Sequence, residues 1–418
     1  AEPQPDGSYK LSGTKIFITY GEHDMADNIV HLVLARTPTA PEGVKGISLF
    51  IVPKFLVKPD GTLGERNDAW CVSIEHKLGI HASPTAVMAF GDHGGAVGYL
   101  VGEENRGLEY MFVMMNVARF GVGMEGVSVS ERAYQRARDY ANERIQGTDI
   151  GVRGGPRVPI IAHPDVRRML MTMRAQAEAT RALAYVVAGA HDAATCHPDA
   201  DQRQRNQAFV DLMIPVVKGW STEIGIEVAS LGIQVHGGMG YMEETGAAQY
   251  LRDARISTIY EGTTGIQAND LIGRKMARDG GAVFKRVIGV MREVERELAG
   301  SASADLEAIG ARLAVAVDAL NRAGDWIVQR FPVDVRAVSA SAVPFLRLFG
   351  VVAGGWQMAR AALVAQARVD AGDDDSFYHA KVITARFYAD HLLTQAEGLA
   401  STVIDGSAAV LAMPLDQY

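Results

Sequence analysis

Cysteine and long apolar segments are both scarce in this sequence, and each absence narrows the classes of protein that it can be. The 418 residues include two cysteines, Cys71 and Cys196, which lie far apart and form no CxxC pattern. Neither a disulfide framework nor a cysteine-ligated metal is therefore indicated. No uninterrupted apolar run reaches the ~18–20 residues that a membrane-spanning helix needs. The first residues, AEPQPDGSYK, also lack the charged segment and apolar core of a signal peptide. We expect a cytoplasmic protein with reduced thiols and no membrane span.

The signatures of several common enzyme classes are absent as well. The sequence has no GxSxG elbow, no HExxH pair and no P-loop. Four of its histidines, His23, His81, His163 and His236, share no metal-ligand spacing. The net charge of −8 argues against general attraction to nucleic acid. We expect neither a metal site nor a nucleic-acid partner.

The first ~100 residues have the pattern of short β-strands. Tyr9 and Leu11 alternate with polar neighbours after an Asp-Gly turn signal, and apolar runs follow at Ile29–Ala35, Ile47–Val52 and Cys71–Ile74. Connections rich in Pro, Gly and Asp separate these runs. Short strands at this spacing predict a small barrel or sandwich.

Beyond Gly102 the apolar residues recur at helical spacing. One long helix starts after Gly107, and others cover about Gln207–Leu231, Ala342–Val369 and Ser376–Leu399. We therefore predict an α+β protein. Its predicted domains are a β domain at residues 1–102, a helical bundle at 103–282 and an additional helical domain at 283–418.

Two punctuated segments could carry chemistry. In His236–Tyr241, HGGMGY, glycines could let the backbone approach a phosphate or a flavin, or they could form a tight turn between helices. No strand pattern precedes this loop, so a dinucleotide-binding Rossmann fingerprint is not indicated. In YEGTTGIQ, Glu261 lies in a segment unsuited to a helix interior and could project from an irregular turn as a base. A solvated loop glutamate is the alternative.

Two arginines on the long helix form a further candidate pair. Arg119 and Arg144 are separated by about seven turns of ~3.6 residues, so they lie on one helix face. They are either solvated side chains or anion contacts at opposite ends of the helix.

Several separated motifs, in order along the chain, together resemble the acyl-CoA dehydrogenase family. GTKIFIT resembles a β-domain segment of that family, in which Thr19 would hydrogen-bond the flavin and Phe17 would pack beside its ring. HKLGIHASPTAVMAF resembles a second β-domain signature, with His81 in place of the usual arginine. ARFGVGMEGVSVSERAYQRARDYANERIQG resembles the first long helix of the family's bundle. There Arg119 matches a substrate-end arginine, and Arg144 and Gln146 match contacts to a neighbouring subunit's cofactor.

The resemblance extends to both punctuated segments. QVHGGMGY resembles the family's flavin-binding loop, where Gln234, Gly237 and Gly238 would meet the adenosine-diphosphate part of FAD across a dimer. LRDARISTIYEGTTGIQ places Glu261 at the general base. The site residues implied beside it are Gly262 and Thr263 as substrate and cofactor contacts, and Tyr241 and Tyr260 as pocket walls.

Two features indicate which members of the family the chain resembles. Some members carry the base on the long helix, but that position here is Ala118, which cannot take a proton. GDDDSFYHAKVITARFYADHLL resembles the extra C-terminal helical domain of larger bacterial members, which include methylmercaptopropionyl-CoA dehydrogenases. The family's N-terminal helical domain and the first β-domain flavin motif have no counterpart here, so we expect this chain to be part of a longer protein.

The resemblance implies an FAD enzyme of fatty-acid β-oxidation that desaturates an acyl-CoA thioester at Cα–Cβ. Glu261 would remove the α-proton, the flavin would take the β-hydride, and an electron-transfer flavoprotein would accept the electrons. A homodimer or larger homo-oligomer is implied by the contacts to a neighbouring cofactor. The alternatives are an acyl-CoA oxidase, a DNA-associated flavoprotein relative with little dehydrogenase activity, and a folded but inert remnant.

Overall fold

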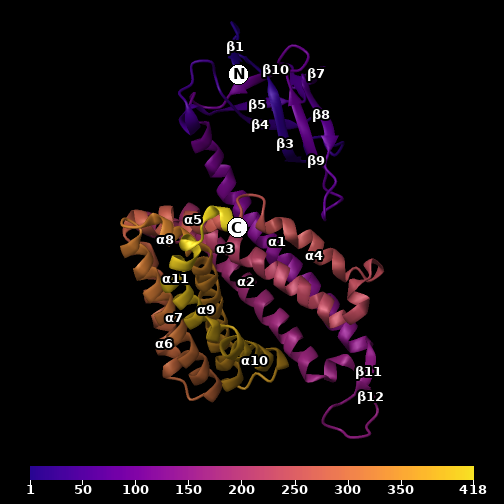
Figure 1. Ribbon diagram of the computed structural model, residues 1–418, viewed down its shortest axis with the longest axis vertical. Helices are drawn as coiled ribbons and strands as arrows, with labels where there is room; N and C mark the ends of the chain where they lie inside the picture. Colours follow the sequence, from indigo (N-terminus) through magenta and orange to yellow (C-terminus); the bar gives the residue numbers. More distant parts are fainter. The chain divides into compact units, whose positions relative to one another are not determined.

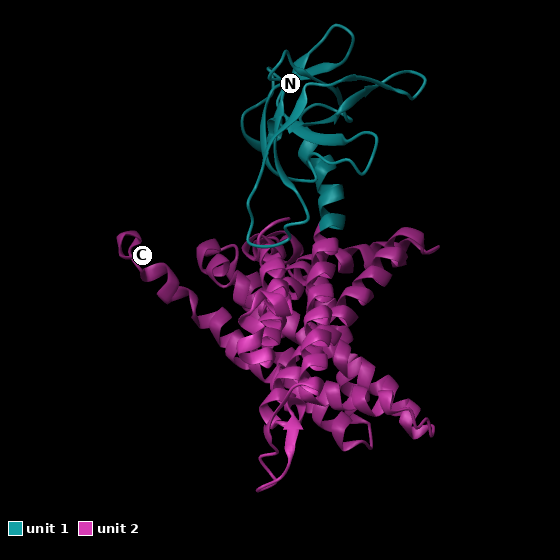
Figure 2. Ribbon diagram, turned by 90° about the vertical axis from the view of Figure 1, so that its right-hand side faces the viewer, with its two compact units in different colours: residues 1–118 teal, residues 119–418 magenta.

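A computed structural model describes residues 1–418 as two compact units (Figure 2). Unit 1 is residues 1–118 and unit 2 is residues 119–418. Helix α1 (Gly107–Glu143) begins in unit 1 and continues into unit 2. Strands dominate unit 1 and helices dominate unit 2, which confirms the predicted α+β class. The three-part division at residues 102 and 282 stays a prediction.

Unit 1 is built from two antiparallel sheets and a separate hairpin (Figure 1). The larger sheet has the order β1-β2-β10-β5-β4, the smaller β3-β9-β8, and the hairpin is β6-β7. The strands are β1 (Glu2–Pro3), β2 (Tyr9–Leu11), β3 (Gly13–Thr19), β4 (Val30–Ala35), β5 (Ser48–Pro53), β6 (Phe55–Val57), β7 (Leu63–Arg66), β8 (Ala69–Ile74), β9 (Thr85–Phe90) and β10 (Ala96–Leu100).

A single apolar core lies between the strands of unit 1. Leu11, Phe50 and Val52 from the larger sheet pack with Met88 and Phe90 from the smaller one, and all five are buried. Strands β5 and β9 are buried at almost every position and supply most of this core. The predicted barrel or sandwich is therefore present as two sheets around one core.

Unit 2 is a helical assembly with one short β-ribbon. Helices α6 to α11, drawn from orange-brown to yellow, gather on one side of α2 to α4 (Figure 1). The elements are β11 (Ile145–Thr148), β12 (Arg157–Pro159), α2 (Pro164–Cys196), α3 (Ala200–His236), α4 (Ala247–Arg255), α5 (Thr264–Asn269), α6 (Ala282–Ala299), α7 (Ala304–Arg330), α8 (Val335–Ala340), α9 (Ala342–Asp370), α10 (Ser376–His391), α11 (Ala396–Asp405) and α12 (Ser407–Ala412).

Helix α9 is the central apolar helix of unit 2. It is long and apolar enough to cross a membrane, but 78% of its most apolar window is buried inside the protein. Its glycines allow close packing, because a Cβ on Gly350 would lie 2.1 Å from the ring of Trp220 in α3. The side chain of Trp220 thus fills the space that Gly350 leaves against α9. This contact locks α3, which carries part of the candidate site, to the core.

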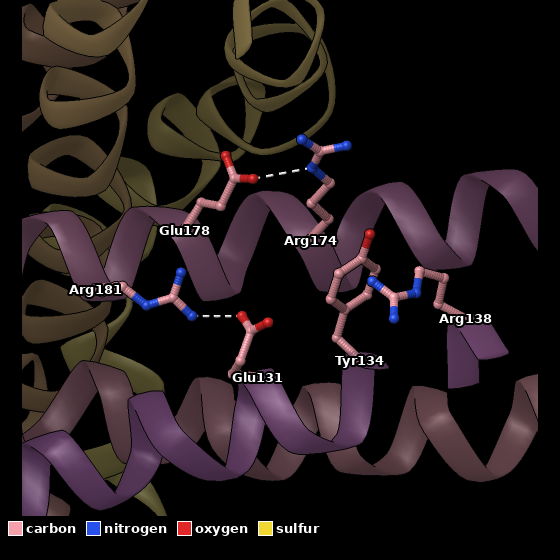
Figure 3. Close-up of a pocket in the computed structure, with 6 residues that line it drawn as sticks. All are labelled: Glu131, Tyr134, Arg138, Arg174, Glu178 and Arg181. Carbon is pink, nitrogen blue, oxygen red and sulfur yellow. Dashed lines mark hydrogen bonds and ion pairs between the residues drawn. The ribbon is translucent and has the colours of Figure 1, made fainter. Parts of the chain in front are cut away.

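A polar pocket between α1 and α2 joins these two helices by ion pairs (Figure 3). Arg181 of α2 pairs with Glu131 of α1. Glu178 of α2 accepts from Arg174 at 2.9 Å and from Lys381 of α10 at 2.6 Å. The ion pairs therefore link α1, α2 and α10, so we interpret the pocket as a link between helices rather than as an anion site.

Three predicted boundaries are wrong in ways that have physical causes. Helix α3 begins earlier than predicted, because the Asp199 carboxylate caps its first turn, and it ends later, at His236. The single helix predicted over Ser376–Leu399 is interrupted by a 3-10 turn at Leu393–Gln395. Helix α1 ends at Glu143, so Arg144 follows this helix rather than lying on it.

Candidate active site

The segment Tyr260–Gly262 forms an irregular turn immediately before α5. It follows a short 3-10 helix, Ile256–Thr258, and precedes the N-cap residue Thr263. The hydroxyl of Thr263 accepts a hydrogen bond from the backbone N–H of Ile266 at 3.2 Å, which fixes where α5 begins. The irregular turn predicted around Glu261 is present.

The backbone of this turn is strained. Glu261 has φ of 52° and Gly262 has φ of 86°, both in the left-handed region. A residue with a Cβ is disfavoured there, so holding Glu261 in this conformation costs free energy, roughly 1–3 kcal/mol. Such strain persists only where the surroundings fix the backbone. The contacts around the turn are therefore the key to its geometry.

Two side chains from neighbouring helices hold the turn by its carbonyl groups. Gln267 of α5 donates from Nε2 to the carbonyls of Glu261 at 3.1 Å and Gly262 at 3.2 Å. Lys218 of α3 donates from Nζ to the Gly262 carbonyl at 2.7 Å. A Cβ on Gly262 would lie 2.7 Å from the Gln267 amide nitrogen, so a larger residue would collide with the group that holds the turn.

The functional groups of Glu261 itself are left free. Its carboxylate makes no hydrogen bond or ion pair, and neither does its backbone N–H. The side chain is half-buried. The half-buried carboxylate can accept a proton. The unused backbone N–H of the same residue can donate to an atom on which negative charge develops.

A second carboxylate lies near Glu261. The Tyr260 hydroxyl donates a hydrogen bond to Glu125 of α1. Partial removal from water raises the pKa of Glu125, and the negative charge of Glu261 adds to this rise. Burial also raises the pKa of Tyr260, so its hydroxyl stays protonated and remains a donor. This bond fixes the ring of Tyr260 at the edge of the turn.

Lys218 is the cation of this region. It is fully buried in α3, and burial lowers its pKa to about 8. Glu223, Glu261 and Glu125 favour its charged form, whereas Arg119 opposes it. Glu223 also accepts a hydrogen bond from the Thr264 hydroxyl at 2.6 Å, so α3 contacts the turn and the start of α5 at two points.

Arg119 has an internal partner. Its guanidinium is buried and pairs with Asp270 at 3.1 Å, and Asp270 also accepts from Arg274 Nε at 2.6 Å. Asp270 opens a π-helical segment, Asp270–Met276, directly after α5. The Nε atom of Arg119 is buried and has no hydrogen-bond acceptor. A role for Arg119 in substrate binding stays a prediction, while its observed contact joins α1 to the segment after the turn.

The glycine-rich loop follows the end of α3. Gly237–Tyr241 forms a 3-10 turn between α3 and α4, and Gly237 has φ of 59°. Gln234, Gly237 and Gly238 are exposed, and no atom lies within 4 Å of a Cβ built on either glycine. Beneath the loop, the buried His236 stacks on Tyr140 at 4.3 Å. The loop is therefore a supported backbone with an open outer face.

The other predicted residues lie on elements that make no hydrogen bond to the turn. Arg144 directly precedes β11 and Gln146 lies in it; both are exposed, at the end of unit 2 opposite α5 (Figure 1). Tyr241 is 84% exposed on the glycine-rich loop. In unit 1, Phe17 has φ of 59° at an irregularity in β3, with its side chain 67% exposed, and Thr19 is exposed at the end of that strand.

Sequence reasoning missed three residues around the turn: Lys218, Gln267 and Glu125. One signal was available, because Lys218 is a lone charge within the apolar run MIPVVKGW. A lysine in such a run is buried only at a cost unless it has partners. Gln267 and Glu125 carry no comparable signal, since their contacts depend on how α1 and α5 pack.

Comparison with known proteins identifies related chains over the whole length. Residues 105–276 match the family model "Acyl-CoA dehydrogenase, C-terminal domain", and residues 290–414 match "Acetyl-CoA dehydrogenase C-terminal like". The 3-methylmercaptopropionyl-CoA dehydrogenase of Ruegeria pomeroyi is 50% identical over 99% of this chain and 70% of its own length. The broad-specificity linear acyl-CoA dehydrogenase FadE5 of Mycobacterium tuberculosis is 40% identical over 94% of this chain and 67% of its own.

Solved structures have the same fold. Caenorhabditis elegans ACDH-11 in complex with C11-CoA has a TM-score of 0.74 at 21% identity, covering 97% of this chain and 64% of its own. The Bacillus anthracis acyl-CoA dehydrogenase complexed with FAD has a TM-score of 0.74 at 20% identity, covering 98% of this chain and 67% of its own. This chain spans about two thirds of the length of these relatives. On the strength of the sequence matches, the chain belongs to the acyl-CoA dehydrogenase family.

Proposed function

We propose that the protein containing this chain dehydrogenates an acyl-CoA thioester between Cα and Cβ, with FAD as cofactor and Glu261 as the base that removes the α-proton. The observation that carries this proposal is the turn at Glu261. A strained, held backbone presents a carboxylate and an N–H that have no partners of their own. Strain that the surroundings maintain is typical of functional sites.

The residues present fit FAD. Gly237 and Gly238 leave open space at an exposed loop, where a flat or anionic group can approach the backbone. Arg144 is an exposed cation suited to a diphosphate, and Gln146 lies beside it. Phe17 and Thr19 would contact the flavin ring, and Thr263 would also contact the cofactor. When bound, FAD supplies the acceptor for the hydride that leaves Cβ.

The chain's own residues account for the proton step. The carboxylate of Glu261 accepts the α-proton, and its backbone N–H donates to the thioester oxygen as negative charge develops there. The hydrogen bond to Glu125 holds Tyr260 at the side of the substrate. Gly262 allows the backbone to pass close to the thioester, and Arg119 and Tyr241 complete the proposed substrate contacts. The rigid turn keeps the base aligned with Cα.

We further propose that an electron-transfer flavoprotein accepts the electrons and that the active protein is a homo-oligomer. Exposed Arg144, Gln234, Gly237 and Gly238 support the second point, because each is free to serve a neighbouring subunit's FAD. Oxygen uptake during turnover would indicate an oxidase instead.

The direct test is anaerobic mixing of the FAD-loaded protein with a panel of acyl-CoAs, followed through the flavin absorbance. The name of the relative at 50% identity places 3-methylmercaptopropionyl-CoA first in the panel, and that of FadE5 adds linear acyl-CoAs. Bleaching with formation of the enoyl-CoA is expected for one class. A flavin that binds and is reduced by no acyl-CoA contradicts the proposal.

A further inference from the structure

Lys218 is the one buried lysine in contact with the turn at Glu261. Its side chain is fully buried in α3, although an ammonium group is costly to remove from water. Its neighbour along the helix, Trp220, packs against α9 and keeps this part of α3 in place. A buried charge in such a position needs interactions that offset its loss of hydration.

One such interaction is the hydrogen bond from Lys218 to the turn. The Nζ atom donates to the Gly262 carbonyl at 2.7 Å, which is the carbonyl of the residue that follows Glu261. Gln267 donates to the same carbonyl at 3.2 Å. This oxygen therefore accepts two hydrogen bonds, one from a residue of α3 and one from a residue of α5. A charged donor forms the stronger of two such bonds. Lys218 therefore opposes the relaxation of the left-handed turn.

Three acidic side chains from different elements act electrostatically on Lys218. They are Glu223 on α3, Glu125 on α1 and Glu261 in the turn itself, and Arg119 on α1 is the opposing cation. Burial lowers the pKa of Lys218 to about 8, while the acids raise it. The ammonium thus balances carboxylates that would otherwise repel one another near the base.

We propose that Lys218 is a positioning residue, whose buried ammonium holds the Gly262 carbonyl and thereby fixes the orientation of Glu261. This inference rests on the proposed function, since it presumes that Glu261 is the base. It assigns Lys218 no contact with substrate. Its effect is on alignment of the carboxylate with Cα, and misplacement of a reacting group by about 1 Å can slow a reaction about 100-fold.

The test compares Lys218→Met, Lys218→Arg and Glu261→Gln with the wild-type protein, all loaded with FAD. Lys218→Met keeps the length of the side chain and loses the donor and the charge. We expect it to slow flavin reduction by about 10- to 100-fold, with acyl-CoA affinity changed by less than about twofold. Lys218→Arg retains a charged donor and should recover at least about one third of that loss on a logarithmic scale.

Lys381→Met is the matched control. Lys381 is also a largely buried lysine of unit 2, but its partner is Glu178 rather than the turn. We expect it to change the reduction rate by less than about twofold. A general loss of packing would lower the rate in both lysine variants, whereas positioning predicts an effect at Lys218 alone.

The outcomes separate the two proposals. If acyl-CoA reduces the flavin of Glu261→Gln at the wild-type rate, the proposed base is wrong, whatever the rate in the Lys218 variants. If Glu261→Gln is inactive but the flavin of Lys218→Met is reduced at the wild-type rate, the proposed base stands and only the positioning role of Lys218 is wrong. Should Lys218→Met not fold, NMR of lysine-labelled wild-type protein decides. A solvent-protected Lys218 ammonium supports the contact, and one that exchanges like a surface lysine contradicts it.

Discussion

The turn at Glu261 and the loop at Gly237–Tyr241 both contain a residue with positive φ, but they are held in different ways. Side chains of α3 and α5 hold the carbonyls of the first from within. The second lies over the stacked pair Tyr140–His236, and the Thr245 hydroxyl donates to its Met239 carbonyl at 2.9 Å, but Gly237 and Gly238 face open space. A positive φ therefore occurs both in a turn whose carbonyls are held and in a loop with open glycines.

The difference agrees with the two roles proposed above, a base in the turn and a cofactor-binding surface at the loop. A base must be placed to a fraction of an ångström, so its backbone is fixed by side-chain donors. A surface that receives a phosphate or flavin needs space and exposed backbone, so glycines leave it empty. Changes in the turn should accordingly alter the rate, and changes in the loop should alter cofactor affinity.

The largest expected effect is at the turn. Glu261→Gln keeps the shape of the side chain and removes the proton acceptor. Flavin reduction by acyl-CoA should fall by at least about 100-fold, since general-base catalysis contributes about 10² to 10⁴. FAD affinity should be unchanged, as measured by titration of the apoprotein. Loss of FAD affinity with a normal reduction rate would reverse the comparison between turn and loop.

Gly262→Ala should have the next largest effect. Gly262 has φ of 86°, and the added Cβ would lie 2.7 Å from the Gln267 amide nitrogen. We expect a loss of about 1–3 kcal/mol in the free energy of unfolding, measured by denaturant titration. The reduction rate should fall with it, because the bonds to the turn are displaced. A variant with wild-type stability would show that the turn is less constrained than its contacts indicate.

Gly237→Ala and Gly238→Ala form a matched pair on the loop. Only Gly237 has a positive φ, 59°, and neither position has a neighbouring atom within 4 Å. Gly237→Ala should cost about 1–2 kcal/mol of stability and Gly238→Ala less than about 0.5 kcal/mol. Both should weaken FAD binding, since each methyl group projects into the open space. Unchanged FAD affinity in both would remove the loop from the cofactor site.

The last prediction concerns a pH dependence of stability. Burial lowers the pKa of Lys218 from 10.5 to about 8, so between these values the unfolded chain binds a proton that the folded protein does not. The free energy of unfolding therefore gains a contribution that rises with pH over this window. Thermal stability of the wild type relative to Lys218→Met should rise across it and be flat below it. A difference that falls with rising pH would contradict this sign.

The sequence predicts the periodic parts of the fold better than the site. The helix predicted at Ala342–Val369 is α9 (Ala342–Asp370), because its apolar residues repeat over many turns. The interruption at Leu393–Gln395 could not be predicted, since the apolar pattern continues through it. At the site, the unusual composition around Glu261 predicts an irregular turn. The lone charge in MIPVVKGW indicates a buried lysine that needs partners, but the carbonyls that Lys218 and Gln267 reach depend on packing between helices.

The measurement that tests the account most directly isolates the proton step. An acyl-CoA with sulfur in place of the β-carbon has no β-hydrogen to transfer, so the protein can only exchange its α-proton. Deuterium uptake at Cα in D₂O, followed by mass spectrometry, reports that exchange. We predict uptake with the wild-type protein and a loss of at least about 100-fold in Glu261→Gln. Equal uptake by both proteins would show that another group removes the α-proton.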